Sequence, residues 1–148
     1  MRERVDLKSP VREYRPPGSV RGAPGNRRPY LDNAEKDLAA RTKSFARRII
    51  RMYVALPREP VAQVLGKQAL RAGTSIGANY READRARSKA EFISKVGECL
   101  KETDETLYWL ELLSDEQIVT ASRLAPLIQE ANELVSILVT ISKRGRGE

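Results

Sequence analysis

The chain has 148 residues, a formal net charge of +7 and no histidine. This length suits one domain with its own hydrophobic core. Without histidine, Ser-His and Cys-His nucleophile pairs and the Glu-x-x-His di-iron sites of helical bundles are excluded. The single cysteine cannot form an intrachain disulfide. Because no stretch resembles a signal peptide, we expect a cytoplasmic protein.

Residues 1–31 are rich in proline, glycine and basic side chains. The first thirty residues hold eight Arg or Lys against three acids, so most of the net positive charge lies there. Few large apolar side chains are present, and burial cannot offset the entropy cost of ordering such a segment. We predict a disordered arm whose charges, including Arg27 and Arg28, either contact phosphates or only keep the chain soluble.

Two helices are predicted next, on either side of the corner "LPREP". The first starts at "DNAE", where Asp32 precedes Glu35 by three residues, and Pro57 ends it. Pro60 suits the first turn of the second helix, which reaches about Ala86. The predicted inward residues of the first helix are Leu38, Thr42, Phe45, Ile49, Met52 and Leu56. Those of the second are Val61, Leu65, Ala72 and Ile76.

Two further sets of residues share faces of the second helix. A ridge of small residues comprises Ala62, Gly66, Ala69, Gly73 and Gly77. Each glycine costs a helix about 1 kcal/mol relative to alanine, so the ridge predicts close packing against another helix, within the subunit or in an oligomer. A polar set comprises Gln68, Arg71, Ser75, Asn79 and Glu82. We favour a hydrogen-bonded seam between helices for it, with a binding groove as the alternative.

The third helix is predicted to start at Ser88, which has capping-box spacing with Glu91. Its inward residues are Phe92, Val96, Cys99, Thr103, Leu107, Leu110 and Leu113. Neighbouring helical residues point about 100° apart. Trp109, next to inward Leu110, is therefore expected at a flank or a subunit interface.

The fourth helix is predicted from a cap at Thr120 to about Lys143. Pro126 either bends this helix or defers its start. The inward residues are Leu124, Leu127, Ile128, Ala131, Leu134, Val135, Leu138 and Ile141. The longest apolar run, residues 134–141, is far shorter than the roughly 20 residues of a membrane span, so we expect a soluble protein. Residues 144–148 are predicted to be a disordered tail.

These elements predict an all-α fold: an antiparallel, up-down-up-down four-helix bundle over residues 32–143. The acids of the third helix are Glu91, Glu98, Glu102 and Glu105. We interpret them as a solvated face pairing with Lys95 and Lys101. Cys99 lies on the inward stripe and is interpreted as a core side chain. We therefore expect no metal site, no cofactor and no enzymatic activity.

Basic residues gather at two places in the predicted bundle. Lys43, Arg47 and Arg51 are spaced four apart on the first helix, with Arg48 beside them. The second group is Arg81, Arg85 and Arg87, near the corner after the second helix. Both groups are suited to contacts with phosphates, which contribute affinity for a nucleic acid without selecting its base sequence. The alternative interpretation is an ordinary solvated helix face.

Three segments resemble a known family: "FARRIIRMYVALP", "GKQALRAGTSIGANYREADRARSKAEFISKVGECLKETDETLYWLELL" and "LIQEANELVSILVTI". Over about residues 35–143 the chain is similar to the four-helix bundle proteins encoded in 23S rRNA intervening sequences. A related fold is the accessory variability determinant of diversity-generating retroelements. The family's signature positions match Gln68, Arg71, Ser75, Ile76, Asn79 and Glu82. Many members have Gly in place of Ala83, and the basic arm is not part of the pattern.

The resemblance implies a homopentameric ring. In the retroelement relatives it also implies a basic surface that engages nucleic acid and a reverse transcriptase. Our leading hypothesis is a non-enzymatic homo-oligomer that binds RNA or DNA through phosphates, as an accessory of a ribonucleoprotein or of a reverse transcriptase. The alternative is a protein-interaction scaffold that does not bind nucleic acid.

Overall fold

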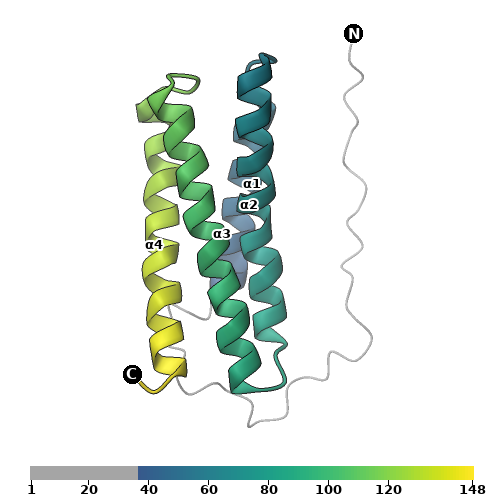
Figure 1. Ribbon diagram of the computed structural model, residues 1–148, viewed down its shortest axis with the longest axis vertical. Coiled ribbons are helices and arrows are strands. Elements are labelled where there is room, and N and C mark those ends of the chain that lie inside the picture. Colours follow the sequence, from purple (N-terminus) through teal and green to yellow (C-terminus); the bar gives the residue numbers. More distant parts are fainter. Residues whose placement is uncertain (1–36) are drawn as a thin grey trace.

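The structure is a computed structural model that describes residues 37–148. Four antiparallel helices form one bundle, with α1 behind α2 in the view of Figure 1. They are α1 (Leu38–Val54), α2 (Pro60–Asp84), α3 (Lys89–Asp115) and α4 (Ala121–Gly145). The predicted all-α four-helix bundle is confirmed. The predicted arm, with Arg27 and Arg28, and the predicted cap at Asp32 lie outside the described residues.

Local sequence signals set the helix starts. Glu59 is extended and Pro60 occupies the first turn of α2, where its missing N–H costs nothing. The Ser88 Oγ accepts a hydrogen bond from the Glu91 N–H at 3.0 Å, as a capping box requires. Glu91 Oε2 in turn accepts a hydrogen bond from the Arg87 N–H, one residue before the N-cap, also at 3.0 Å.

The fourth helix differs from its prediction at both ends. Thr120 is the N-cap, but its side chain makes no capping hydrogen bond. The helix begins at Ala121, ahead of Pro126, so the proline does not defer its start. It continues to Gly145, two residues beyond the predicted end, and the Glu148 N–H donates to the Lys143 carbonyl at 2.9 Å.

The core is built from one face of each helix. Phe45, Ile76, Phe92 and Leu134 are almost completely buried, as are most of the predicted inward residues. Val61 is an exception, because its side chain is 52 % exposed and the prediction that it points inward is wrong. The buried row of α2 begins one residue later and comprises Ala62, Gly66, Ala69, Ala72, Gly73, Ile76, Tyr80 and Ala83.

The small-residue ridge of α2 packs against α1 inside the subunit. A Cβ atom added at Gly73 would lie 2.9 Å from Ile49 Cγ1, and one at Gly77 would lie 3.3 Å from Thr42 Oγ1. A Cβ atom added at Gly66 would lie 2.9 Å from Tyr53 Cδ2 and closer still to Leu56 Cδ1. The glycines therefore let the two helix backbones approach each other, and the ridge lends no support to an oligomer.

Among the described residues, α4 is the one helix whose length and composition would let it cross a membrane, with a mean hydropathy of 1.3 over its most apolar window. The sequence argument, based on the length of the apolar run alone, did not anticipate this. The large apolar side chains of its inner face, Leu124, Leu134, Leu138 and Ile141, are buried in the bundle. They contribute to the high hydropathy, because a core helix needs such a face, and the bundle buries 33 % of the most apolar window.

Candidate nucleic-acid interface

A basic column runs along the outer face of α1. Lys43, Arg47 and Arg51 are exposed, and Arg48 beside them is half-buried. A helix rises 1.5 Å per residue, so residues spaced four apart place their charges at intervals of about 6 Å. No carboxylate of residues 37–148 lies within ion-pairing distance of these four cations. We call these four residues the α1 column.

Some other cations of the bundle are paired with acids. Arg41, on the neighbouring face of α1, binds Glu130 at 3.0 Å and Glu133 at 2.8 Å on α4. Its partial desolvation acts to lower its pKa, but the hydrogen bonds and charges of the two acids outweigh this and the pKa is raised. Lys95 pairs with Glu82 at 2.7 Å, and that hydrogen bond raises the pKa of Lys95. The cations of the α1 column therefore differ from these in lacking a carboxylate partner.

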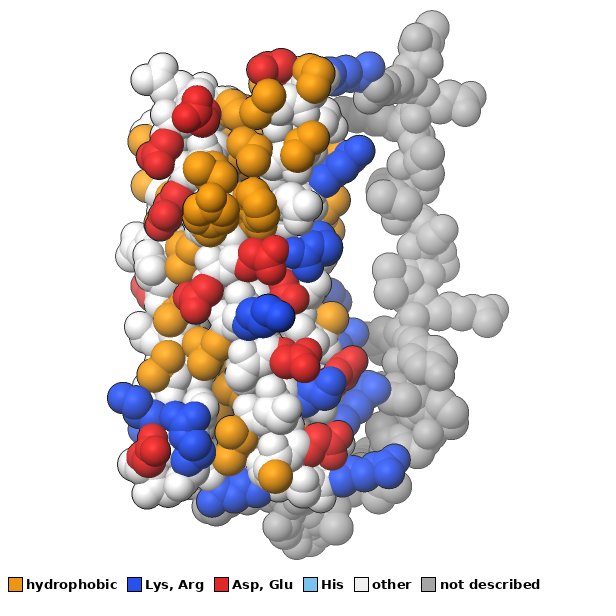
Figure 2. Space-filling view, viewed as in Figure 1, with side chains coloured by type: hydrophobic (Ala, Val, Ile, Leu, Met, Phe, Trp, Pro, Cys, Tyr) orange, Lys and Arg blue, Asp and Glu red, His pale blue; other side chains and the backbone are white. Residues whose placement is uncertain are grey.

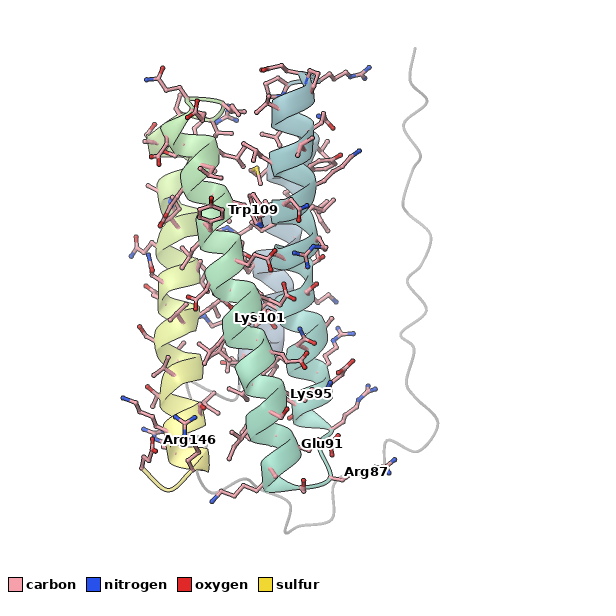
Figure 3. All side chains as sticks on the ribbon, viewed as in Figure 1. Arg87, Glu91, Lys95, Lys101, Trp109 and Arg146 are labelled. Carbon is pink, nitrogen blue, oxygen red and sulfur yellow. The ribbon has the colours of Figure 1, made fainter. Side chains whose placement is uncertain are left out.

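The second basic group lies at the α2–α3 corner. Arg81, Arg85 and Arg87 are exposed, and Figure 3 places Arg87 at the lower end of the bundle. Lys89, which the sequence analysis did not include, is exposed two residues further on. The side chains of these four residues, which we call the corner cluster, also have no ion-pair partner in the described part of the chain. The α1 column starts near the same end, because Thr42 packs against Gly77.

The predicted polar set lies along the edge between α2 and α3. The Arg71 guanidinium contacts Glu105 and lies 3.6 Å from Glu102 Oε2, and Glu82 pairs with Lys95. Ser75 instead donates to the Arg71 carbonyl of its own helix at 2.6 Å. Gln68 accepts from Arg71 at 3.5 Å, and Asn79 is half-buried. Two of the five members thus bond across to α3.

An apolar patch lies on the same face, near the end where α2 begins. Val61 and Val64 are 52 % and 62 % exposed, and Tyr108 is 54 % exposed. Trp109 is half-buried, and its ring lies edge-on to that of Tyr108 with the ring centroids 5.1 Å apart. The Trp109 indole N–H donates to Glu105 Oε1 at 3.4 Å. Figure 2 shows hydrophobic side chains gathered over the upper parts of α2 and α3. Trp109 is therefore on a flank of α3, as predicted from its neighbour Leu110.

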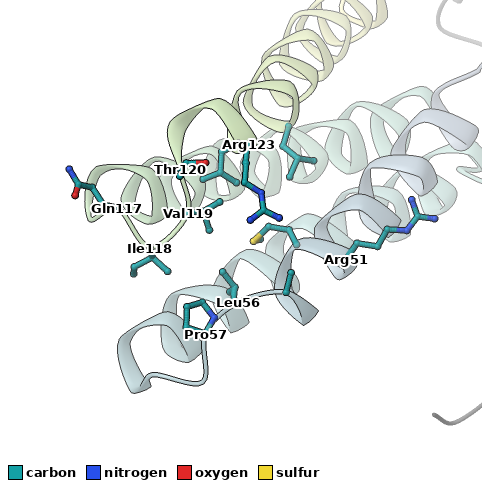
Figure 4. A pocket seen from close by; sticks show the side chains of 12 residues that line it. Arg51, Leu56, Pro57, Gln117, Ile118, Val119, Thr120 and Arg123 are labelled. Carbon is teal, nitrogen blue, oxygen red and sulfur yellow. The ribbon is translucent and has the colours of Figure 1, made fainter.

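A pocket of about 330 Å³ lies where the α1–α2 and α3–α4 corners meet (Figure 4). Met52, Leu56 and Val119 are among its apolar lining residues, and Arg51 and Arg123 are its cations. The sequence analysis missed this pocket. Two corners more than fifty residues apart build it, and no local pattern brings them together.

Gln117, in the lining of this pocket, has an unusual backbone conformation. Its φ of 56° lies in the left-handed region, where glycine is usual. The Ile118 N–H donates to the Leu113 carbonyl and the Gln117 N–H to the Ser114 carbonyl, both at 3.0 Å. These two bonds are a Schellman motif that ends α3 with glutamine at the glycine position.

Cys99 has the environment of a core residue. It is completely buried, and burial raises the pKa of its thiol to about 12. Its Sγ lies 3.6 Å from the Ile76 carbonyl, as a weak donor. A thiol in this state is a poor nucleophile. The residues described here also contain no cluster of Cys, Asp and Glu suited to a metal ion.

Residues 35–140 match the family described as 23S rRNA-intervening sequence protein. The chain belongs to this family. It is also similar to a solved structure from Bacteroides thetaiotaomicron, a protein of unknown function from the S23 ribosomal protein family. That protein is 42 % identical, and the match covers 71 % of this chain and 94 % of the other, with a TM-score of 0.67. A search of curated proteins gives no match.

The part shared with the 23S rRNA-intervening sequence family contains all the surfaces described above. The α1 column, the corner cluster, the polar set, the apolar patch and the pocket all lie within residues 35–140. Arg27 and Arg28 lie outside it. These candidate surfaces therefore lie within the part of the chain that matches the family.

Proposed function

We propose that this protein is a non-enzymatic, homo-oligomeric bundle that binds RNA through its phosphates, with the α1 column as the main contact surface. The observation that carries the proposal is the regular column of Lys43, Arg47 and Arg51, which have no carboxylate partner within residues 37–148. Arg41, Arg71 and Lys95 in the same part of the chain do have such partners. An exposed cation without an acid partner keeps its full charge for an external anion.

The regular spacing of the α1 column supports the same function. Charges at intervals of about 6 Å along a helix are comparable in spacing to successive phosphates of a nucleic-acid strand. Such contacts release counterions and hold the backbone without reading bases. The corner cluster adds a second phosphate contact. Membership of a family named for an rRNA insertion favours RNA over DNA as the ligand.

The apolar patch supports the homo-oligomer. Exposed apolar side chains grouped on one face are typical of protein interfaces, and Tyr and Trp are enriched at such sites. The pentameric ring remains a prediction of the family resemblance, as does a reverse-transcriptase partner. A ring would repeat the α1 column around its axis, so that several weak phosphate contacts act together.

The test is fluorescence anisotropy with a labelled single-stranded RNA at about 50 and 200 mM salt. The triple variant Lys43→Gln/Arg47→Gln/Arg51→Gln is expected to bind more weakly. The slope of log K against log salt is negative, and its magnitude should fall by about 2, since each lost contact removes about 0.7. The matched control is Arg58→Gln/Lys67→Gln/Lys101→Gln, which removes three exposed cations elsewhere. An unchanged slope in the first variant would place the RNA on another surface.

The second candidate function is a protein-interaction scaffold that does not bind nucleic acid. The apolar patch favours it, because the same surface suits another protein as well as a second copy. Absence of RNA binding by the full chain at low salt, with the patch required for a protein complex, would establish this candidate and exclude the first.

A further inference from the structure

The pocket between the two corners combines apolar walls with positive charge at its edge. None of its twelve lining residues is acidic, and two are arginines. In Figure 4 the Arg123 guanidinium lies over the cavity, and Arg51 extends outward along α1. Neither has an ion-pair partner in residues 37–148. The pocket therefore suits a ligand with an anionic group and an apolar body.

The volume and the polar groups narrow the ligand class. About 330 Å³ is within the range of small-ligand pockets, which are mostly apolar with a few placed polar groups. Besides the two arginines, the polar residues in the lining are Gln117 and Thr120. An amide and a hydroxyl both donate and accept hydrogen bonds, as the edge of a nucleobase requires. Arginine can bind a phosphate and can also stack on a base.

The backbone of Gln117 adds a second, independent reason. A left-handed conformation costs an L-residue roughly 1–2 kcal/mol, and glycine is the usual residue at this place in a helix end. Gln117 is also one of the polar residues in the pocket lining. Backbone strain of this kind occurs at ligand sites, and here it coincides with the cavity.

The pocket also continues the α1 column. Arg51 belongs to both, so a strand lying along Lys43 and Arg47 reaches the cavity at the end of α1. We propose that the pocket binds a nucleoside phosphate, with its phosphate at Arg123 and its base between Met52, Leu56 and Val119. This inference rests on the proposed RNA binding and assigns a place for one unpaired nucleotide. The same chemistry is offered by a free nucleotide and by a nucleotide within a strand.

The experiment measures the binding of adenosine 5′-monophosphate and of a short labelled single-stranded RNA to the full chain. Arg123→Gln is expected to weaken binding about tenfold or more, because it removes a charge-assisted contact. Ala55→Phe places a ring in the cavity from an exposed position and is expected to do the same. The matched controls are Lys101→Gln and Ala125→Phe, at exposed positions outside the pocket, and both are expected to leave binding unchanged.

Each outcome decides between the possibilities. Loss of mononucleotide binding in Ala55→Phe supports the pocket with a free nucleotide as ligand, and an effect on the RNA alone supports it with a nucleotide within a strand. The pocket proposal is wrong if both pocket variants still bind RNA and mononucleotide binding is unaltered or absent. In that case the proposed phosphate contacts of the α1 column are unaffected. A full chain that binds no RNA and no mononucleotide overturns both. Thermal unfolding of each variant shows that the bundle is intact.

Discussion

At the scale of single residues, Gln117 occupies a backbone position where glycine would be less strained. The Schellman motif that ends α3 requires a left-handed residue, and the chain places glutamine there with a φ of 56°. A pattern search for helix ends looks for glycine, so the sequence provided no signal for this end. The left-handed conformation of Gln117 and the pocket beside it can be recognised only in the three-dimensional structure.

Replacement of this residue by glycine is expected to stabilise the fold and to impair the pocket. Gln117→Gly relieves left-handed strain of roughly 1–2 kcal/mol but adds unfolded-state entropy of roughly 0.5–1 kcal/mol. The free energy of unfolding should therefore rise by about 0.5–1 kcal/mol, as measured by urea titration, while nucleotide affinity falls.

The control for this prediction is the same substitution in a regular helix. Gln129→Gly, at an exposed position within α4, should lower the free energy of unfolding by roughly 0.5–1 kcal/mol, because glycine is a poor helix former. If both variants are equally destabilised, the left-handed strain at Gln117 is not significant.

At the scale of elements, the small-residue ridge determines how closely α1 and α2 pack. Gly73→Ala gains roughly 1 kcal/mol of helix propensity, but its new methyl group would lie 2.9 Å from Ile49 Cγ1 in the core. Overpacking costs typically 1–3 kcal/mol, so we expect the free energy of unfolding to fall by about 1 kcal/mol in chemical denaturation.

Gly97→Ala on α3 is the matched control for the ridge. A Cβ atom there meets nothing within 4 Å, so only the propensity gain remains and the variant should be stabilised by up to about 1 kcal/mol. Equal stabilisation of both variants would show that α1 and α2 have room to separate, contrary to the structure.

The elements themselves were largely predictable from the sequence. Pro60 and the pair Ser88 and Glu91 mark helix starts by local chemistry, and the helical period identifies most of the core. A period states which residues share a face, but it does not state which helix packs against that face. For this reason the sequence did not identify the helix that packs against the ridge, and Val61 was assigned to the wrong face.

At the scale of the whole molecule, two charged surfaces differ in whether their side chains have ion-pair partners. The edge between α2 and α3 pairs its charges internally, whereas the α1 column has no ion-pair partner among residues 37–148. Basic spacing on α1 was visible in the sequence. The lack of acid partners was not, because Glu130 and Glu133 reach Arg41 from a helix almost ninety residues away.

The apolar patch leads to the last prediction, which concerns assembly. Light scattering on the full chain at micromolar concentration should give a mass of about five times the 16.6 kDa of one chain, as the family resemblance implies. Val64→Glu puts a charge into the patch at an exposed position and should lower that mass, because a buried unpaired charge is costly at an interface. Val54→Glu is the matched control, since Val54 is also exposed but lies on α1, outside the patch.

Assembly and RNA binding should then change together. If subunits bind one RNA side by side, dissociation removes avidity and weakens RNA affinity tenfold or more, although Val64→Glu leaves every cation of the α1 column in place. Wild-type protein with the mass of a single chain contradicts the oligomer. A dissociated Val64→Glu variant with unchanged RNA affinity keeps the oligomer but shows that each subunit binds its RNA alone.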